Sequence, residues 1–455
     1  MSRLAENIYF RSPTWLQNLL ISTYGYNLYR KRYKGIFTDI MAEIRLTEDL
    51  NAKQIEALQA ERLNQMIEYC KKNIPYYQKL LADHSLCSQD FTQTYHIKKL
   101  PILKKSTVKT HPEWFRPKSG AKAWMEQHTS GSTGTPLSLD VDEYTYKLAM
   151  ALLVRHEEKA GVPFRAPRAT FAGRMLQRFE NQSPPFSRYN RAENQRLFSS
   201  YHLSESNFSH YRKELNAFQP KELIGYPSVI SQLANQYLES AIEPGFSPKA
   251  VITNSETLLD WQRGKIESAF GTAVYDYYGT AEYVMFAGQS GDGTYYPNPL
   301  IGLTELLPTN LISNEHDIVV TTLCNTAMPL IRYDIGDTAI PRSDESKLHG
   351  APKITAFSGR KDDYLLTPSG RKIGRTGEIF GYFPSVKEAQ IVQETPEHCR
   401  LLVVLEKGAT LDEDALVRQC QKKLSSEIRF EIEYKTEIPR SSNGKFKSVV
   451  NKVSD

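Results

Sequence analysis

The chain has 455 residues, of which 40% are apolar and 24% are charged. This composition is typical of a soluble globular protein and excludes extensive disorder, and the length predicts one large domain with a smaller one beside it. A net charge of +5, spread along the chain, gives no case for a protein that binds nucleic acid.

The cysteines and the apolar segments bear on the compartment. Five cysteines lie far apart without a Cys-x-x-Cys pair, so they predict neither a disulfide framework nor a zinc site, and a reducing cytoplasm is expected. We expect neither a secretory signal nor a transmembrane helix, because no stretch of about 18 consecutive apolar residues occurs. The aromatic segment 15–29 is interrupted by polar residues, and we expect it to pack on the body of the protein rather than on a membrane surface.

The predicted elements indicate an α/β fold. Apolar residues recur at helical spacing over residues 52–72, and this helix should end before Pro75. Short apolar runs then alternate with helical segments, which is typical of a domain with mixed or parallel sheets and flanking helices. Ligands bind such sheets beyond the carboxyl ends of the strands. Strands are predicted at 223–226, 250–253 and 273–278, and helices at 229–241 and 259–270.

The composition of the sequence changes after Asp337. The segment 358–375 is rich in glycine and charge and predicts a domain boundary. We therefore expect a large N-terminal domain over residues 1–357 and a small, mobile α+β domain over residues 358–455. The smaller domain has predicted strands at 388–393, 400–405 and 430–434 and a predicted helix at 412–428.

A loop that precedes these strands has the composition of a phosphate-binding site. Residues 129–136 (TSGSTGTP) contain two glycines and five hydroxyl side chains, whose donors can bind phosphate oxygens. The Walker pattern is absent, since no lysine follows the second glycine. Alone, such a run also fits an ordinary loop. Its candidate ATP-binding residues are Thr129, Ser130, Gly131, Ser132, Thr133, Gly134 and Thr135.

Partners for this loop follow later in the chain. The motif YGTAE offers the aromatic face of Tyr278 for a base, the hydroxyl of Thr280 for a phosphate and the carboxylate of Glu282 for Mg²⁺. Asp337 could hold both ribose hydroxyls, and Lys445 lies on a predicted turn near the C-terminus. Each has an ordinary structural explanation as a core, turn or surface residue. Their occurrence together in this order argues for a shared function.

These motifs agree in type, order and spacing with the adenylate-forming superfamily of acyl-CoA synthetases, peptide-synthetase adenylation domains and luciferases. Within it, the chain resembles the phenylacetate–coenzyme A ligase branch, including relatives associated with capsule biosynthesis. The resemblance covers residues 53 to 450, and residues 1–45 lie outside it. The segments that carry it are 65–77, 100–105, 136–137, 225–228, 253–256 and 321–337.

The resemblance implies a reaction and roles for single residues. A carboxylic acid is activated with ATP and Mg²⁺ as acyl-AMP, and the acyl group is then transferred, commonly to coenzyme A. Lys445 is implied as the catalytic cation, Thr280 and Glu282 as phosphate and Mg²⁺ contacts, and Asp362 as the hinge of the small domain. The implied ATP contacts, besides the loop, are Ser255, Glu256, Tyr277, Tyr278 and Gly279 around the adenine and Asp337 and Arg360 at the ribose.

One residue departs from the family pattern. Ala281 stands where the family usually has Thr or Ser, whose hydroxyl contacts the α-phosphate, and Thr280 is the candidate replacement. Losing one such hydrogen bond typically costs on the order of 2.7–4 kcal/mol of transition-state stabilisation. We expect activity, and a slow or divergent enzyme is one outcome of this departure.

Three functions stay open from the sequence. The first is an acyl-CoA ligase, the second an enzyme that delivers its acyl group to an amine, a sugar or a carrier protein, and the third a non-catalytic nucleotide-binding protein. The sequence does not identify the acid. Tyr226, Tyr275 and Phe171 indicate a pocket for an aryl or other apolar acid. We expect a small-molecule carboxylic acid as substrate, without nucleic-acid or integral-membrane partners, and a homodimer remains open.

Overall fold

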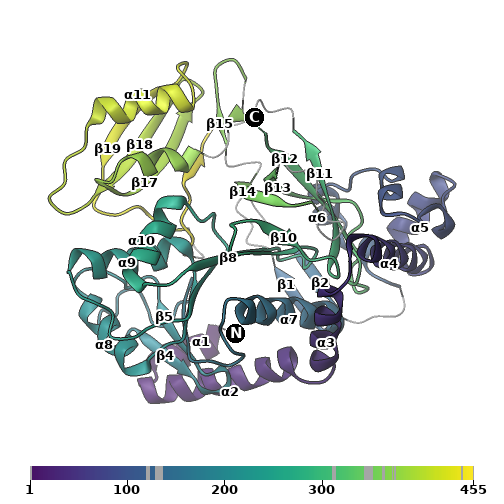
Figure 1. The fold of residues 1–455 in the computed structure, drawn as a ribbon, viewed down its shortest axis with the longest axis horizontal. Coiled ribbons are helices and arrows are strands. Elements are labelled where there is room, and N and C mark those ends of the chain that lie inside the picture. The colour runs from purple at the N-terminus through teal and green to yellow at the C-terminus, as the bar shows by residue number, and fades with distance from the viewer. Residues whose placement is uncertain are drawn as a thin grey trace.

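The computed structural model describes residues 3–118, 123–128, 137–309, 314–342, 352–360, 364–370, 372–373, 376–441 and 444–453. Figure 1 shows a large body with a smaller unit (yellow) resting on α9 and α10. The helices are α1 (Arg3–Arg11), α2 (Thr14–Tyr33), α3 (Phe37–Glu48), α4 (Ala52–Asn73), α5 (Pro75–Asp83), α6 (Lys105–Thr110), α7 (Glu143–Lys159), α8 (Phe208–Phe218), α9 (Pro227–Glu239), α10 (Asp260–Phe270) and α11 (Glu413–Lys423).

The body is built on a mixed sheet of twelve strands in the order β11-β12-β13-β14-β10-β9-β8-β7-β6-β3-β5-β4. A hairpin of β1 and β2 lies outside this sheet. The strands of hairpin and sheet are β1 (Met125–His128), β2 (Ser138–Val141), β3 (Arg168–Ala172), β4 (Ser187–Asn190), β5 (Gln195–Ser199), β6 (Glu222–Gly225), β7 (Ala250–Asn254), β8 (Val274–Gly279), β9 (Phe286–Gln289), β10 (Tyr295–Pro297), β11 (Gly302–Pro308), β12 (His316–Thr322), β13 (Tyr333–Pro341) and β14 (Ile354–Arg360).

The predicted α/β class is confirmed, and the sheet is mixed. Strands β5, β3, β6, β7 and β8 are mutually parallel, as the alternation of strands and helices predicts. The other half, from β9 to β14, pairs antiparallel throughout, so the sheet is of the mixed kind that the prediction allowed. Strands in that half follow one another without crossover helices, which parallel pairing would require.

Both faces of the parallel strands are covered by helices, and the alternation of side chains sorts them. Leu223 and Val251 point toward α8, α9 and α10. Ile224 and Ile252, the next residue in each strand, lie in a separate cluster with Val162, just after α7. Successive residues of a strand face opposite sides, so two apolar neighbours supply both layers.

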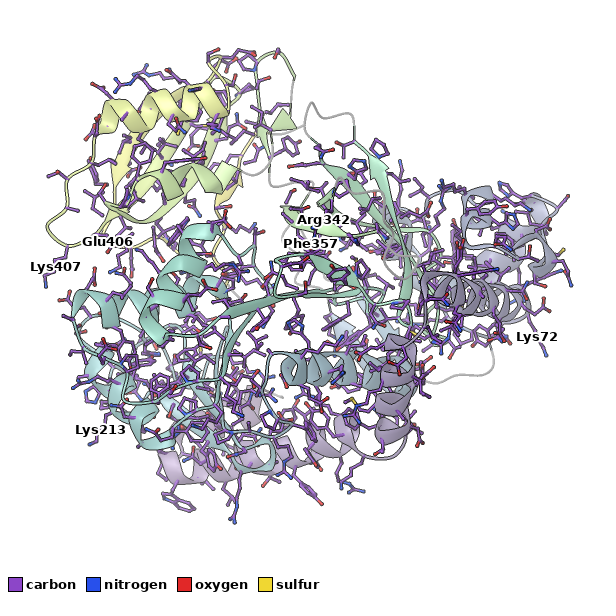
Figure 2. The ribbon with its side chains drawn as sticks, viewed as in Figure 1. Lys72, Lys213, Arg342, Phe357, Glu406 and Lys407 are labelled. Carbon is purple, nitrogen blue, oxygen red and sulfur yellow. The ribbon has the colours of Figure 1, made fainter. Side chains whose placement is uncertain are left out.

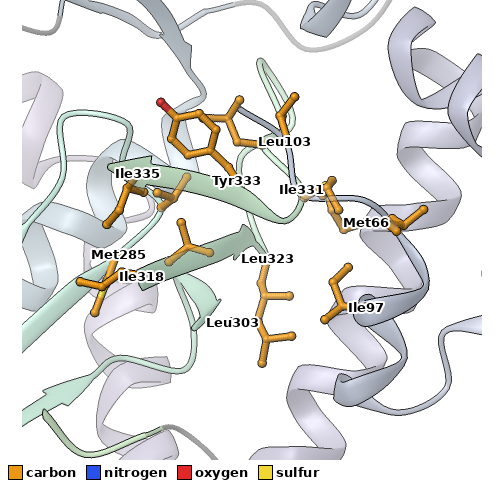
Figure 3. Close-up of a cluster of buried hydrophobic side chains, with 14 of the residues drawn as sticks. Met66, Ile97, Leu103, Met285, Leu303, Ile318, Leu323, Ile331, Tyr333 and Ile335 are labelled. Atoms are coloured by element: carbon orange, nitrogen blue, oxygen red, sulfur yellow. The ribbon is translucent and has the colours of Figure 1, made fainter. Parts of the chain in front are cut away.

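Helix α4 matches its prediction from the sequence. Asn51 and Gln54 form a capping box at its start, and it ends at Asn73, before Pro75. Its apolar stripe packs with α5 and with β11–β13 in a large buried cluster, shown in Figure 3 around Met66, Ile331 and Tyr333. The helix thereby fixes one end of the antiparallel half of the sheet.

The aromatic segment near the N-terminus packs on the body, as predicted. It forms α2, which runs beside β4 at the edge of the sheet (Figure 1). Gly25 sits directly against Asn190, because a Cβ there would lie 2.2 Å from the Oδ1 of that residue. Ser22 donates a hydrogen bond to the carbonyl of Tyr189. Within the described ranges, no helix has both the length and the apolar character needed to cross a bilayer.

The smaller unit has its own sheet and core. Its strands run in the order β19-β18-β17-β20, and α11 packs with β17 and β18 around Leu401 and Leu416. The predicted helix at 412–428 is shorter in the structure, because the chain leaves it at Leu424 and turns at Ser425, whose hydroxyl accepts the amide of Glu427. The remaining strands are β15 (Leu365–Leu366), β16 (Lys372–Ile373), β17 (Val386–Thr395), β18 (His398–Leu405), β19 (Arg429–Tyr434) and β20 (Val449–Asn451).

Polar contacts join the smaller unit to the body. Glu406, after β18, pairs with Lys265 of α10 and accepts a hydrogen bond from Asn235 of α9 at 3.0 Å. The next residue, Lys407, pairs with Glu205 at 2.7 Å. Figure 2 shows Glu406 and Lys407 at the face of the smaller unit that meets the body.

Asp276, in the middle of β8, predicts a pH dependence of stability. It is buried, and its carboxylate accepts hydrogen bonds from Thr253 at 2.6 Å and Tyr295 at 2.7 Å. Burial raises the pKa of Asp276 to about 7. Since the folded pKa exceeds the unfolded value of about 4, the folded state binds this proton more tightly, and the free energy of unfolding should fall as the pH rises from about 4 to about 7.

Asp276→Asn should remove this part of the pH dependence, which is worth roughly 3 kcal/mol between pH 5 and pH 8. Denaturant titrations at pH 5 and pH 8 measure it, with the exposed Asp414→Asn on α11 as control. Equal pH dependence in Asp276→Asn and the unmodified protein would contradict this assignment.

Candidate active site

The carboxyl ends of the parallel strands bring predicted site residues together. Tyr226 follows β6, Ser255 and Glu256 follow β7, and Gly279 ends β8 shortly before Glu282. Strands β6, β7 and β8 are adjacent and parallel, so these residues share one edge of the sheet.

Lys445 reaches this edge from the smaller unit. Its Nζ lies 5.9 Å from the centre of the Tyr226 ring, within range of a cation–π contact. The turn that carries it is closed by Ser441, whose hydroxyl accepts the amide of Lys445 at 3.0 Å and donates to its carbonyl at 2.8 Å. The backbone around the lysine is thus fixed by hydrogen bonds.

Glu256 ties the lysine turn to the body. One carboxylate oxygen accepts the amide of Phe446 at 2.7 Å, and the other accepts the amide of Ser228 at 3.2 Å. Ser228 is in the first turn of α9, whose exposed amides favour a carboxylate. Burial raises the pKa of Glu256, and these two amides act against that rise. The carboxylate therefore bridges α9 and the segment that follows Lys445.

Gly444 permits the close approach of this turn. Its φ is +75°, and a Cβ at this position would lie 2.9 Å from the hydroxyl of Tyr201 and 3.0 Å from the Cα of Gly173. Both the backbone conformation and the space therefore require glycine. Tyr201 also donates a hydrogen bond to the carbonyl of Gly173 at 3.2 Å, so the turn rests on a braced segment after β3.

The structure brings together two predicted site residues, Tyr278 and Asp337. The Tyr278 hydroxyl donates to the carboxylate of Asp337 at 2.5 Å. The Tyr278 ring stacks on Phe357, labelled in Figure 2, with ring centres 3.9 Å apart. In β14, Arg360 pairs across from Asp337 of β13, although its side chain is outside the described part. The two residues predicted at the ribose, Asp337 and Arg360, thus lie on neighbouring strands, and Tyr278 reaches Asp337 from β8.

Glu282 has two partners that were not among the predicted site residues. The Nζ of Lys105 lies 3.1 Å from its Oε1, and the Tyr333 hydroxyl donates to the same oxygen at 3.2 Å. Leu103 pairs with Tyr333 of β13 (both labelled in Figure 3). This pairing places Lys105, the first residue of α6, next to Glu282. The lysine lies in the motif at 100–105, whose likeness to the family was the available signal.

The surroundings of Glu282 fit Mg²⁺. Among the described side chains, no three His, Cys, Asp or Glu residues are grouped to hold a metal by themselves. Mg²⁺ commonly takes only one or two protein carboxylates and completes its shell with substrate phosphates and water. A single buried carboxylate, held at present by the displaceable ammonium of Lys105, suits that mode.

The hydroxyl of Thr280 lies next to Ala281, which is exposed. Thr280 Oγ1 accepts the amide of Val284 at 3.3 Å. An accepting hydroxyl keeps its own proton for donation. Thr280 can therefore still donate to a phosphate, as its predicted role requires.

Three aromatic candidates lie away from this edge. Phe171 is fully buried and stacks on Phe198 at 5.0 Å, so it is a core residue and its assignment to an acid pocket needs correction. Tyr277 stacks on Phe286 at 5.3 Å, and Tyr275 lies edge-on to His156 of α7. Both face the α7 side of β8, opposite Tyr278, because successive strand residues alternate. The geometry gives no support to their predicted ligand contacts.

Other predicted residues are only partly described. Ser255 is exposed, has φ +70° and donates to Asn254 at 2.7 Å. A positive φ is uncommon for serine and is typical of constrained functional backbone. The loop 129–136 and the hinge residue Asp362 lie outside the described residues, so their roles stay predictions.

Comparisons with known proteins agree with the resemblance inferred from the sequence. The model of the CapK C-terminal domain matches residues 365–452. Protein CapK of Staphylococcus aureus is 28% identical over 98% of this chain and 99% of its own length. That coverage includes most of residues 1–45, which the resemblance in the sequence left out.

Two further matches concern ligases. The phenylacetate–coenzyme A ligase of Escherichia coli K12 is 24% identical over 76% of this chain and 78% of its own. A 2-hydroxyisobutyryl-CoA ligase, solved in the postadenylation state with an acyl-AMP, superposes with a TM-score of 0.69 at 18% identity, covering 89% of this chain and 90% of its own. These matches together support the adenylate-forming superfamily, in the branch of the phenylacetate–coenzyme A ligases and CapK, as the family that this chain resembles.

Proposed function

We propose that this protein activates a carboxylic acid with ATP, forming acyl-AMP and pyrophosphate, and then transfers the acyl group to coenzyme A. The observation that carries the proposal is the docking of the Lys445 turn at the carboxyl ends of β6 and β7. There Glu256 binds the amide of Phe446, and the Lys445 ammonium lies over Tyr226. In this proposal, the Lys445 ammonium is thereby held where the carboxylate of the acid and the α-phosphate of ATP must meet.

The adenylation step needs positive charge at that place. A carboxylate oxygen of the acid attacks the α-phosphorus of ATP, and the bond to the departing pyrophosphate breaks. Lys445 supplies a compact ammonium that stabilises the negative charge developing on the phosphate oxygens in the transition state. This stabilisation lowers the barrier most strongly when the site is preorganised. Mg²⁺ at Glu282 would neutralise the phosphate oxygens, and Thr280 would donate to the α-phosphate in place of the residue at position 281.

Transfer of the acyl group requires Lys445 to leave. We propose domains at 1–357 and 358–455, with rotation of the smaller domain about Asp362. Such motion would break the Glu256–Phe446 hydrogen bond and the ion pair of Glu406 with Lys265, both of which join the two units. Closure and catalysis are therefore coupled, because the same contacts that dock the domain place the lysine.

The proposal is tested by exchange of labelled pyrophosphate into ATP across a panel of carboxylic acids, with Mg²⁺ present and absent. Acid-dependent exchange that requires Mg²⁺ is expected. Mass detection of thioester and AMP, with and without coenzyme A, then tests the acceptor. Exchange with none of the acids would contradict adenylation and favour a non-catalytic nucleotide-binding protein.

A second acceptor class has an observation in its favour. The match to Protein CapK extends over 98% of this chain, whereas the match to the Escherichia coli ligase covers 76%. Transfer of the acyl group to an amine, a sugar or a carrier protein, as in capsule biosynthesis, is therefore our alternative. Acid-dependent exchange without coenzyme A-dependent thioester would favour it.

All five cysteines are free thiols, which fits the cytoplasm as the proposed compartment.

A further inference from the structure

Arg174 occupies a position at the active-site edge that no predicted role uses. It lies two residues beyond the end of β3, which is parallel to β6 and adjacent to it. The carboxyl end of β3 therefore opens onto the same edge as Tyr226. Ala172 is held there by Ser200, whose hydroxyl donates to its carbonyl at 2.9 Å.

The segment that carries Arg174 contacts the lysine turn. Gly444 packs within van der Waals distance of Gly173, as the position of a Cβ there shows. The oxygen of Tyr226 has a hydrogen bond with the backbone of Gly173, and its ring lies beneath Lys445. Arg174 is thus adjacent in sequence to a residue that touches both the catalytic turn and the wall of the site.

The guanidinium of Arg174 lacks a partner in the part of the chain that the structure describes. It forms neither an ion pair nor a hydrogen bond with any described residue, although the side chain is exposed. The carboxylate that acts on it electrostatically is Glu193, which already pairs with Arg32 at 3.0 Å. Arg32 in turn adds a second positive charge near Arg174.

The charges around this guanidinium leave its own charge incompletely balanced. Burial lowers the pKa of Arg174, and the charge of Arg32 lowers it further, whereas Glu193, Tyr24 and Tyr226 act in the opposite direction. An unpaired cation that lies near a second cation favours the binding of an anion, which balances both charges. Its accessible surface leaves room for such an anion to come from solution.

We propose that Arg174 binds a second anionic group of the substrate, so that the enzyme prefers carboxylic acids carrying a further carboxylate or phosphate. This inference rests on the proposed function, since it takes the Lys445 side of the site as the place of the reacting carboxylate. Guanidinium binds both groups with two parallel hydrogen bonds, which gives directional specificity. The sequence suggested an apolar acid pocket that included Phe171. Phe171 is instead a core residue, and this proposal places the Arg174 cation at the acid site.

The test compares matched pairs of acids in the pyrophosphate-exchange assay. One pair is a dicarboxylic acid and its monoamide, and the other a phosphorylated hydroxy acid and its unphosphorylated form. The unmodified protein should favour the charged member of at least one pair, and the pair that shows the preference identifies the group. Arg174→Gln should reduce kcat/KM for that member at least about tenfold, mainly through KM, and leave the neutral member little changed.

Two variants serve as controls. Arg174→Lys keeps the charge without the paired donors and should retain part of the preference, and Arg418→Gln, exposed on α11, should retain all of it. Equal loss for both members of a pair, or a raised KM for ATP or coenzyme A with the acid preference intact, would overturn the role of Arg174.

Binding without turnover separates this inference from the proposed function. Calorimetric titration of the charged acids into the unmodified protein and into Arg174→Gln needs no catalysis. Exchange that proceeds without any preference for charged acids removes the inference and leaves the function standing. Failure of exchange, together with charged-acid binding that is lost in Arg174→Gln, removes the function and leaves the anion site standing.

Discussion

Lys445→Ala should reduce acyl-AMP formation at least about 100-fold, while ATP binding and folding remain nearly intact. The ammonium lies over Tyr226 at the edge where the acid and the α-phosphate are proposed to meet, and removal of one preorganised charge donor typically lowers kcat by this factor or more. The turn itself should survive, because its hydrogen bonds run through Ser441 and backbone atoms. Pyrophosphate exchange measures the loss, and calorimetric titration with ATP measures the retained binding.

The matched control is Lys447→Ala, two residues along the same segment. Its backbone carbonyl accepts a hydrogen bond from Gln390, an interaction that alanine retains. We expect exchange close to that of the unmodified protein. Normal exchange by Lys445→Ala, with only Lys447→Ala impaired, would remove Lys445 from the mechanism.

The second large effect is expected for Asp337→Ala, which should raise the KM for ATP at least about tenfold. A carboxylate that accepts both ribose hydroxyls makes charge-assisted hydrogen bonds, each worth roughly 1.5–3 kcal/mol. The substitution also removes the acceptor of the Tyr278 hydroxyl, so the ring on which the base is proposed to stack loses its anchor. Steady-state kinetics with varied ATP at saturating acid give the KM.

Tyr278→Phe separates the two contributions to that KM. It keeps the stacking on Phe357 and deletes only the hydroxyl that binds Asp337. A rise in KM smaller than that of Asp337→Ala is expected. An unchanged KM in Asp337→Ala would exclude this carboxylate from the ribose site, whatever Tyr278→Phe does.

Several contacts of the candidate site join residues far apart in the chain. Lys105 and Glu282 are 177 positions apart, and Glu256 and Phe446 are 190 apart. The motif at 100–105, which contains Lys105, is recognisable in the sequence. That Lys105 pairs with Glu282 depends on how Leu103 pairs with β13, which the sequence does not show. Contacts of this kind depend on loop paths that local propensity does not determine.

The aromatic residues show the same limit on a smaller scale. The sequence places Tyr275, Tyr277 and Tyr278 in one strand, and the alternation of side chains implies that Tyr277 and Tyr278 face opposite sides. Which side holds the ligand depends on where α7 and Asp337 lie. Phe171 likewise reads as a residue near the site, yet Phe198 of the neighbouring strand covers it.

By itself, the sequence determined the α/β class, helix α4, strands β6 to β8 with their helices, and the motif order that indicates adenylate formation. These follow from periodicity, caps and residue chemistry, which are local properties. Only the tertiary structure decided that β9 to β14 pair antiparallel, that Glu256 docks the Lys445 turn, and that Lys105 meets Glu282 while Arg174 lacks a described partner. The physical reason is that packing and charge pairing join distant segments, and their energies depend on which groups are desolvated together.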